Sequence, residues 1–144
     1  MALDMAKYRR IFIEESTDHL GEISQSLLDL EKEMGSVEAI DTLFRMAHSI
    51  KSMAASLGYD SVADLAHRME DRMEGVRSAG RVRDADELAL LFRGLETLES
   101  MVGAVAEDAP VPAADEALLA ALAEEAPTAP DPDPVGGEPK KVRS

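Results

Sequence analysis

Four stretches of this chain carry apolar residues at every third or fourth position, and this periodicity limits what the chain can fold into. Such spacings place the apolar side chains on one face of an α-helix. The stretches cover roughly residues 4–34, 37–57, 60–80 and 84–105, and none shows the alternating pattern of a strand. We therefore expect an all-α protein in which each of four helices buries one apolar stripe.

Residues with strong capping preferences mark the ends of these segments. Gly35 and Gly58 stand where the first and second helices should end. The expected N-terminal caps are Ser36, either Asp60 or Ser61, and Asp84, which has Glu87 in the capping-box position. Because these connections are short, consecutive helices should be antiparallel neighbours. The sequence thus predicts an up-down-up-down four-helix bundle.

The composition fits this architecture and changes towards the C-terminus. Hydrophobic residues make up 45% of the chain but aromatic residues only 3%, so the core must be aliphatic. That favours helices packed on helices. We expect the bundle at residues 1–108 and an accessory region at 109–126, where "DEALLAALAEE" can form a short fifth helix. The Pro-rich residues 127–144 are typical of a flexible, disordered linker to downstream domains.

Charge and residue usage exclude several classes of function. A net charge of −14 disfavours nucleic acid and anionic membrane surfaces as partners. The chain has no cysteine, which excludes disulfides and thiol catalysis. No apolar run is long enough for membrane insertion, and the N-terminus lacks the apolar region of a signal peptide. We therefore expect a cytoplasmic location.

A cluster of polar residues should lie where the second and third helices face each other. His48 and Lys51 are three positions apart and share a helix face, as do His67 and Glu70. His48 stands about ten positions before the turn near Gly58. At about 1.5 Å rise per residue, it should lie level with residues near 67–70 on the antiparallel neighbour.

This set of residues suits a nucleophilic imidazole. A carboxylate that accepts a hydrogen bond from Nδ1–H fixes the tautomer and stabilises the charge that appears on the ring during attack. Glu70 is the candidate for this role. The Lys51 ammonium is the candidate for balancing a phosphoryl group on Nε2. The small residues Ser52, Ala55 and Ser56 would leave space for a bulky partner.

The stretch "FRMAHSIKSMAASLGY" and the later "AHRME" resemble the histidine phosphotransfer domain at the N-terminus of CheA-type chemotaxis kinases. The resemblance covers roughly residues 5–107. It implies a helical bundle with His48 as phosphoacceptor, Glu70 as the partner of its ring, and Lys51 and His67 as supporting residues. It also implies that His48 receives a phosphoryl group from ATP bound in a separate kinase domain and passes it to an aspartate of a response regulator.

Two features qualify what the resemblance implies. The family usually has glycine directly after the lysine, whereas this chain has Ser52, which puts the transfer rate and the choice of partner in question. The chain also lacks a Gly-rich nucleotide loop, so we expect no cofactor and no ATP site here. The expected partners are a CheA-type kinase domain acting in trans and response regulator receiver domains, and the isolated chain is expected to be a monomer.

Three other interpretations remain open from the residues. The chain could be a stand-alone phosphorelay protein, although its linker-like end argues against this. It could be a helical interaction module in which His48 has no chemistry. His48, His67 and Glu70 could in principle hold zinc, but the ligand spacings typical of helical metal sites are missing, and we expect no metal.

Overall fold

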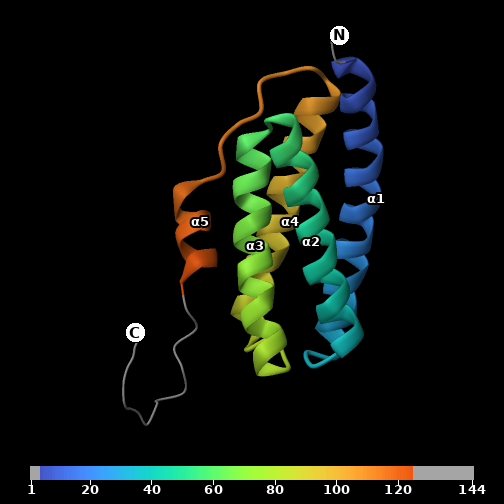
Figure 1. Cartoon of the computed structure of the whole chain (residues 1–144). Coiled ribbons are helices and arrows are strands. Elements are labelled where there is room, and N and C mark those ends of the chain that lie inside the picture. Colours follow the sequence, from blue (N-terminus) through green and yellow to red (C-terminus); the bar gives the residue numbers. More distant parts are fainter. Residues whose placement is uncertain (1–3, 125–144) are drawn as a thin grey trace.

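The protein is an antiparallel helical bundle, seen here in a computed structural model that describes residues 4–124. The helices are α1 (Met5–Lys32), α2 (Val37–Leu57), α3 (Asp60–Ala79), α4 (Ala85–Ala106) and α5 (Glu116–Ala123). The first four run alternately up and down beside one another (Figure 1). The all-α prediction of a four-helix bundle with a short fifth helix is confirmed. The linker predicted at 127–144 lies outside the described residues.

The core is aliphatic apart from Phe12, in keeping with the low aromatic content. Large side chains from all four long helices have lost almost all contact with solvent; they include Phe12, Ile23, Leu27, Leu43, Ile50, Leu65, Met69, Leu91 and Leu98. The most extensive helix pair is α2 with α3, followed by α1 with α2. In the described part of the chain, no helix is both long and apolar enough to cross a bilayer.

The connection between α2 and α3 is two residues long. Gly58 adopts the left-handed conformation, with φ of 82°, and its N–H lies against the carbonyls that end α2. Tyr59 follows as the N-cap residue of α3 without a capping side-chain hydrogen bond, so the prediction of Asp60 or Ser61 as the cap is wrong. The Tyr59 ring packs against Phe12, with centroids 4.9 Å apart. This packing draws Tyr59 into the bundle, and α3 begins directly after it.

The other predicted N-caps are confirmed. The Ser36 hydroxyl accepts a hydrogen bond from the Ala39 N–H at 3.2 Å. Asp84 accepts one from the Glu87 N–H at 2.9 Å, and the Glu87 carboxylate in turn accepts from the Arg83 N–H at 2.7 Å. The capping box is therefore present, with its return bond one residue earlier than in the standard pattern.

The first helix ends earlier than its apolar pattern suggests. Glu33 is the C-cap residue, so α1 stops before Gly35. The Met34 carbonyl accepts a hydrogen bond from the Val82 N–H at 2.9 Å. This bond ties the α1–α2 connection to the α3–α4 connection at the same end of the bundle. Such a contact between distant loops competes with continuing the helix and is not visible in local sequence.

The short helix α5 packs against α3 and α4 on the outside of the bundle (Figure 1). Asp115 caps it by accepting a hydrogen bond from the Ala117 N–H at 3.2 Å. Leu118 and Leu122, one turn apart, are each only 2% exposed. An isolated helix of eight residues would be unstable in water. Burial of these two leucines is therefore what makes α5 helical.

Leu27 and Leu28 provide a matched pair for testing the core. Leu27 is fully buried, whereas its neighbour Leu28 on the same helix is 43% exposed. Leu27→Ala should lower the free energy of unfolding by about 2–5 kcal/mol, because it leaves a cavity. Leu28→Ala should cost less than about 1 kcal/mol. Urea unfolding followed by circular dichroism measures both, and equal losses would contradict this assignment of the core face.

Candidate functional site

His48 lies on α2 at the edge of the helix that faces α3. The neighbours Ala47 and Ile50 point into the core, while the His48 side chain remains 55% exposed. Its ring is therefore held beside the bundle without being enclosed. Ser52, Ala55 and Ser56, one to two turns further along α2, are also exposed. Because these side chains are short, they leave room beside the imidazole for another molecule.

Glu70 reaches the His48 ring from α3, as the antiparallel register predicts. Its Oε2 lies 2.6 Å from His48 Nδ1. The lowered pKa of Glu70 keeps its carboxyl ionised near neutral pH, and an ionised carboxylate can only accept hydrogen bonds, so Nδ1 carries the proton. In the neutral ring, Nε2 then holds a lone pair. The Glu70 side chain is only 11% exposed, so its position is fixed by the surrounding bundle.

Lys51 contacts the same carboxylate from the other side. Its Nζ lies 2.6 Å from Glu70 Oε1, and its side chain is 27% exposed. The ammonium thus pairs with Glu70, one turn of α2 from the ring. Each oxygen of Glu70 has one partner, which restricts rotation of the carboxylate and fixes the His48 tautomer.

The charge on Glu70 depends on these two partners. Burial acts to raise the pKa of the carboxyl, because it penalises the ionised form. The Lys51 ammonium and the hydrogen bond from His48 outweigh burial and hold the pKa below its ordinary value of 4.5. Glu70 is therefore a carboxylate throughout the neutral range.

His67 lies on α3 one turn before Glu70, but its partner is different. Its Nε2 is 3.5 Å from Asp71 Oδ2, and its side chain is 56% exposed. The His48 ring contacts Glu70, and the Glu70 carboxylate contacts Lys51; His67 takes part in neither contact. A supporting role for His67 therefore stays a prediction.

One neighbour of the site was not anticipated from the sequence. The Arg77 guanidinium lies 4.5 Å from the centroid of the Phe44 ring, one turn before His48. Phe44 is three residues before the core residue Ala47 and only partly buried, so its ring remains open to a contact from outside the core. A cation–π contact of this kind covers the end of the α2–α3 pair with a positive charge.

The arrangement is suited to nucleophilic attack by an imidazole. The ring is accessible and its tautomer is fixed. The Glu70 carboxylate is close enough to stabilise positive charge on the ring. Among residues 4–124, no group of three or more histidine or acidic side chains is placed to hold a metal ion.

Fold and site together define a helical-bundle module in which a largely buried carboxylate orients the ring of an exposed histidine. A family model described as the Hpt domain matches residues 7–125. The chain belongs to the Hpt domain family.

The chain is similar to chemotaxis proteins named CheA from several organisms. It is 36% identical over 103 residues to chemotaxis protein CheA of Bacillus subtilis, which is 72% of this chain and 15% of that protein. It is 38% identical over 93 residues to CheA of Listeria monocytogenes, covering 64% of this chain and 15% of that protein. The chain thus spans about a seventh of the length of these relatives. The resemblance to CheA phosphotransfer domains is confirmed.

A solved structure supports the same relationship. The phosphorylated P1 domain of CheA3 from R. sphaeroides, in complex with CheY6, superposes with a TM-score of 0.70 at 26% identity. The match covers 81% of this chain and 92% of that one.

Replacing Glu70 by glutamine should change how stability depends on pH. Because the native pKa lies below 4.5, ionised Glu70 stabilises the fold above that pH, and this stabilisation is lost as the pH falls through the lowered native pKa. The free energy of unfolding of Glu70→Gln should therefore fall less steeply below pH 4.5 than that of the wild type. Urea unfolding at stepped pH measures the slopes.

The matched control is Glu74→Gln, an exposed site one turn further along α3. Equal slopes for Glu70→Gln, Glu74→Gln and the wild type would show that Glu70 is not held ionised by its two partners.

Proposed function

We propose that this chain is the phosphotransfer domain of a CheA-like histidine kinase and that His48 is its phosphoacceptor. In this proposal His48 receives the phosphoryl group from ATP bound in a separate kinase domain and passes it to an aspartate of a response regulator receiver domain. The observation that carries the proposal is the 2.6 Å contact of Glu70 with Nδ1 of a ring that is 55% exposed. Membership of the Hpt family and similarity to CheA support it.

The first transfer step uses the free nitrogen of the ring. The Nε2 lone pair forms a bond to the γ-phosphorus of ATP, while the bond from that phosphorus to the bridging oxygen breaks and ADP leaves. The ring gains positive charge and keeps its Nδ1 proton, which remains hydrogen-bonded to Glu70. The nearby carboxylate stabilises this charge, so Glu70 contributes most as the transition state forms.

The second step reverses the role of the histidine. A carboxylate oxygen of the receiver aspartate bonds to phosphorus, the N–P bond breaks, and Nε2 regains its lone pair. The ring again becomes neutral with its proton on Nδ1. The same Glu70 contact that favours phosphorylation thus keeps the ring in one tautomer through both steps.

The surface around His48 supports docking of other domains. The exposed Ser52, Ala55 and Ser56 carry no long side chains that would block an approaching partner. The similar P1 domain of CheA3 was solved in complex with CheY6, and by analogy we propose a receiver domain as the second partner here. With these partners the chain acts in the cytoplasm, as a substrate and relay without a nucleotide site of its own.

His48→Gln should abolish phosphoryl acceptance and leave the helical content intact. The measurement is labelling by a CheA-type kinase domain added in trans with labelled ATP, followed by acid and base treatment. Label on the wild type should be acid-labile and base-stable. His19→Gln, on α1, is the matched control and should accept normally. Unchanged labelling of His48→Gln would remove His48 as the acceptor and favour an interaction module.

Glu70→Ala should slow acceptance by about ten- to a hundredfold, since control of a proton and tautomer contributes in that range or above. The rate is measured at matched kinase concentration. The exposed Glu74→Ala variant on the same helix serves as the control and should keep the wild-type rate. Equal rates for Glu70→Ala and the wild type would exclude Glu70 from the mechanism.

A further inference from the structure

A second cluster of charges lies on the opposite side of α3 from His48. Arg72 follows Glu70 by two positions, which turns it about 200° around the helix axis. Its Nε donates to the Glu87 carboxylate at 2.8 Å, and the side chains of Arg72 and Glu87 are only 6% and 5% exposed. Neither the predicted site nor the proposed function uses this buried ion pair.

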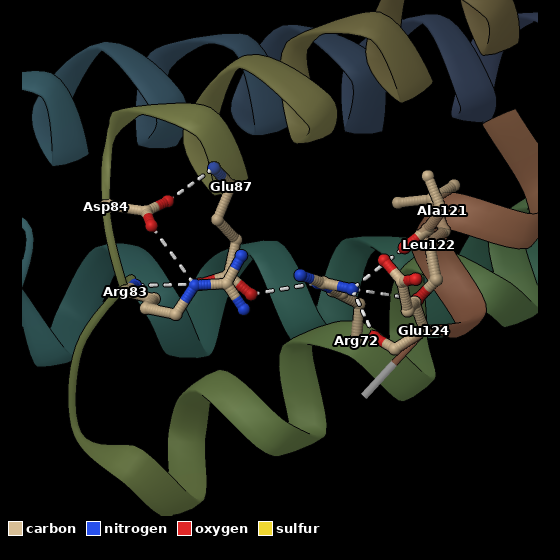
Figure 2. Close-up of polar contacts among 7 residues, drawn as sticks. All are labelled: Arg72, Arg83, Asp84, Glu87, Ala121, Leu122 and Glu124. Atoms are coloured by element: carbon tan, nitrogen blue, oxygen red, sulfur yellow. Dashed lines mark hydrogen bonds and ion pairs between the residues drawn. The ribbon is translucent and has the colours of Figure 1, made fainter. Parts of the chain in front are cut away.

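Arg72 also holds the end of α5. Its Nη1 donates to the carbonyl oxygens of Ala121, Leu122 and Glu124, at 3.0, 3.3 and 2.7 Å. Figure 2 shows the guanidinium between these carbonyls on one side and Glu87 on the other. The last carbonyls of a helix have no partner within the helix and carry partial negative charge. Arg72 therefore caps the C-terminus of α5 from another helix.

Glu87 is itself held in place, so the Arg72 guanidinium pairs with a rigid partner. Its second oxygen accepts from the Arg83 N–H at 2.7 Å, and its own N–H donates to Asp84. The N-terminal cap of α4, the buried ion pair and the C-terminus of α5 form one connected network (Figure 2). Loss of one member would leave a buried charge without its partner, which proteins tolerate poorly.

This network supports the part of α3 that presents Glu70. α5 packs against α3 as extensively as α4 does, so it supplies a large share of the support behind that helix. Met69, next to Glu70, fills the remaining gap to α4: a Cβ built on Gly94 would lie 2.7 Å from its sulfur. The segment of α3 from Met69 to Arg72 thus rests on α4 and α5 while it holds Glu70 against His48.

We propose that Arg72 is a positioning residue that couples the docking of α5 to the Glu70–His48 contact. Docked α5 fixes α3 through Arg72 and keeps Glu70 in place. Released α5, which is too short to stay helical alone, leaves the segment behind Glu70 less supported. Whether α5 is docked or released would in this way regulate how readily His48 reacts. The functional part of this inference rests on the proposed phosphoacceptor role.

The test releases α5 without touching the site. In the full 144-residue chain, Leu118→Ala with Leu122→Ala removes the two buried side chains that anchor α5. Arg72→Met removes the hydrogen bonds that cap the C-terminus of α5. Arg68→Met is the matched control, because Arg68 lies one turn earlier on α3 and is a partly exposed partner of Asp64. Amide hydrogen exchange of residues 116–123 reports whether α5 is docked in each variant.

Two readouts follow the site itself. The ¹⁵N spectrum of the His48 ring gives the fraction of molecules with the proton on Nδ1, and labelling by the kinase domain gives the rate of acceptance. In both α5-releasing variants the Nδ1–H fraction should fall, and acceptance should slow by about two- to thirtyfold, the range of mutations that modulate coupling. Arg68→Met should match the wild type in both. In the Arg72→Met background, the leucine changes should add no further effect.

The outcomes separate the two proposals. An unchanged His48 ring spectrum with α5 released, or leucine effects that persist undiminished in Arg72→Met, would overturn the coupling. Should Arg72→Met fail to fold, the leucine variant alone decides through the same ring spectrum. Absence of labelling in the wild type, together with ring spectra that change as expected, would overturn the phosphoacceptor role and leave the coupling standing.

Discussion

The Glu70 carboxylate, shared between His48 and Lys51, is the interaction on which the site depends. One oxygen lies 2.6 Å from the imidazole and the other 2.6 Å from the ammonium. The carboxylate comes from α3 and both partners come from α2, so the contact exists only if the two helices keep one register. The two-residue connection through Gly58 and Tyr59 sets that register, and the close packing of α2 on α3 maintains it.

The bundle reconciles two requirements that oppose each other. In the proposed role His48 must be exposed to its partners, whereas the group that orients it must be held still. The His48 side chain is half exposed, and Glu70, largely buried and paired twice, supplies the rigidity. Burial alone would disfavour an ionised carboxylate, but the neighbouring cation and hydrogen bond keep the pKa of Glu70 low. His48 and Lys51, the two partners of Glu70, therefore also keep the Glu70 carboxylate ionised.

The third helix has a charged group on each side and links two parts of the molecule. Glu70 faces α2, and Arg72 faces α4 and the end of α5. The four long helices alone would leave α3 with sparse contact to α4, and α5 covers that side. An Hpt domain of this kind is thus better regarded as a bundle of four helices with a fifth that completes the support of α3.

The sequence alone determined the apolar stripes of the helices, because these follow from local periodicity. It also determined the caps at Ser36 and Asp84 and the left-handed turn at Gly58, which follow from backbone preferences. That His48 and Glu70 face each other follows from the rise per residue of two antiparallel helices. Only the tertiary structure decided which of several available partners each charged group took. Lys51 pairs with Glu70, and His67 lies against Asp71. Arg72 is buried because α5 returns over α3 about fifty residues later, and local sequence contains no signal for contacts at that separation.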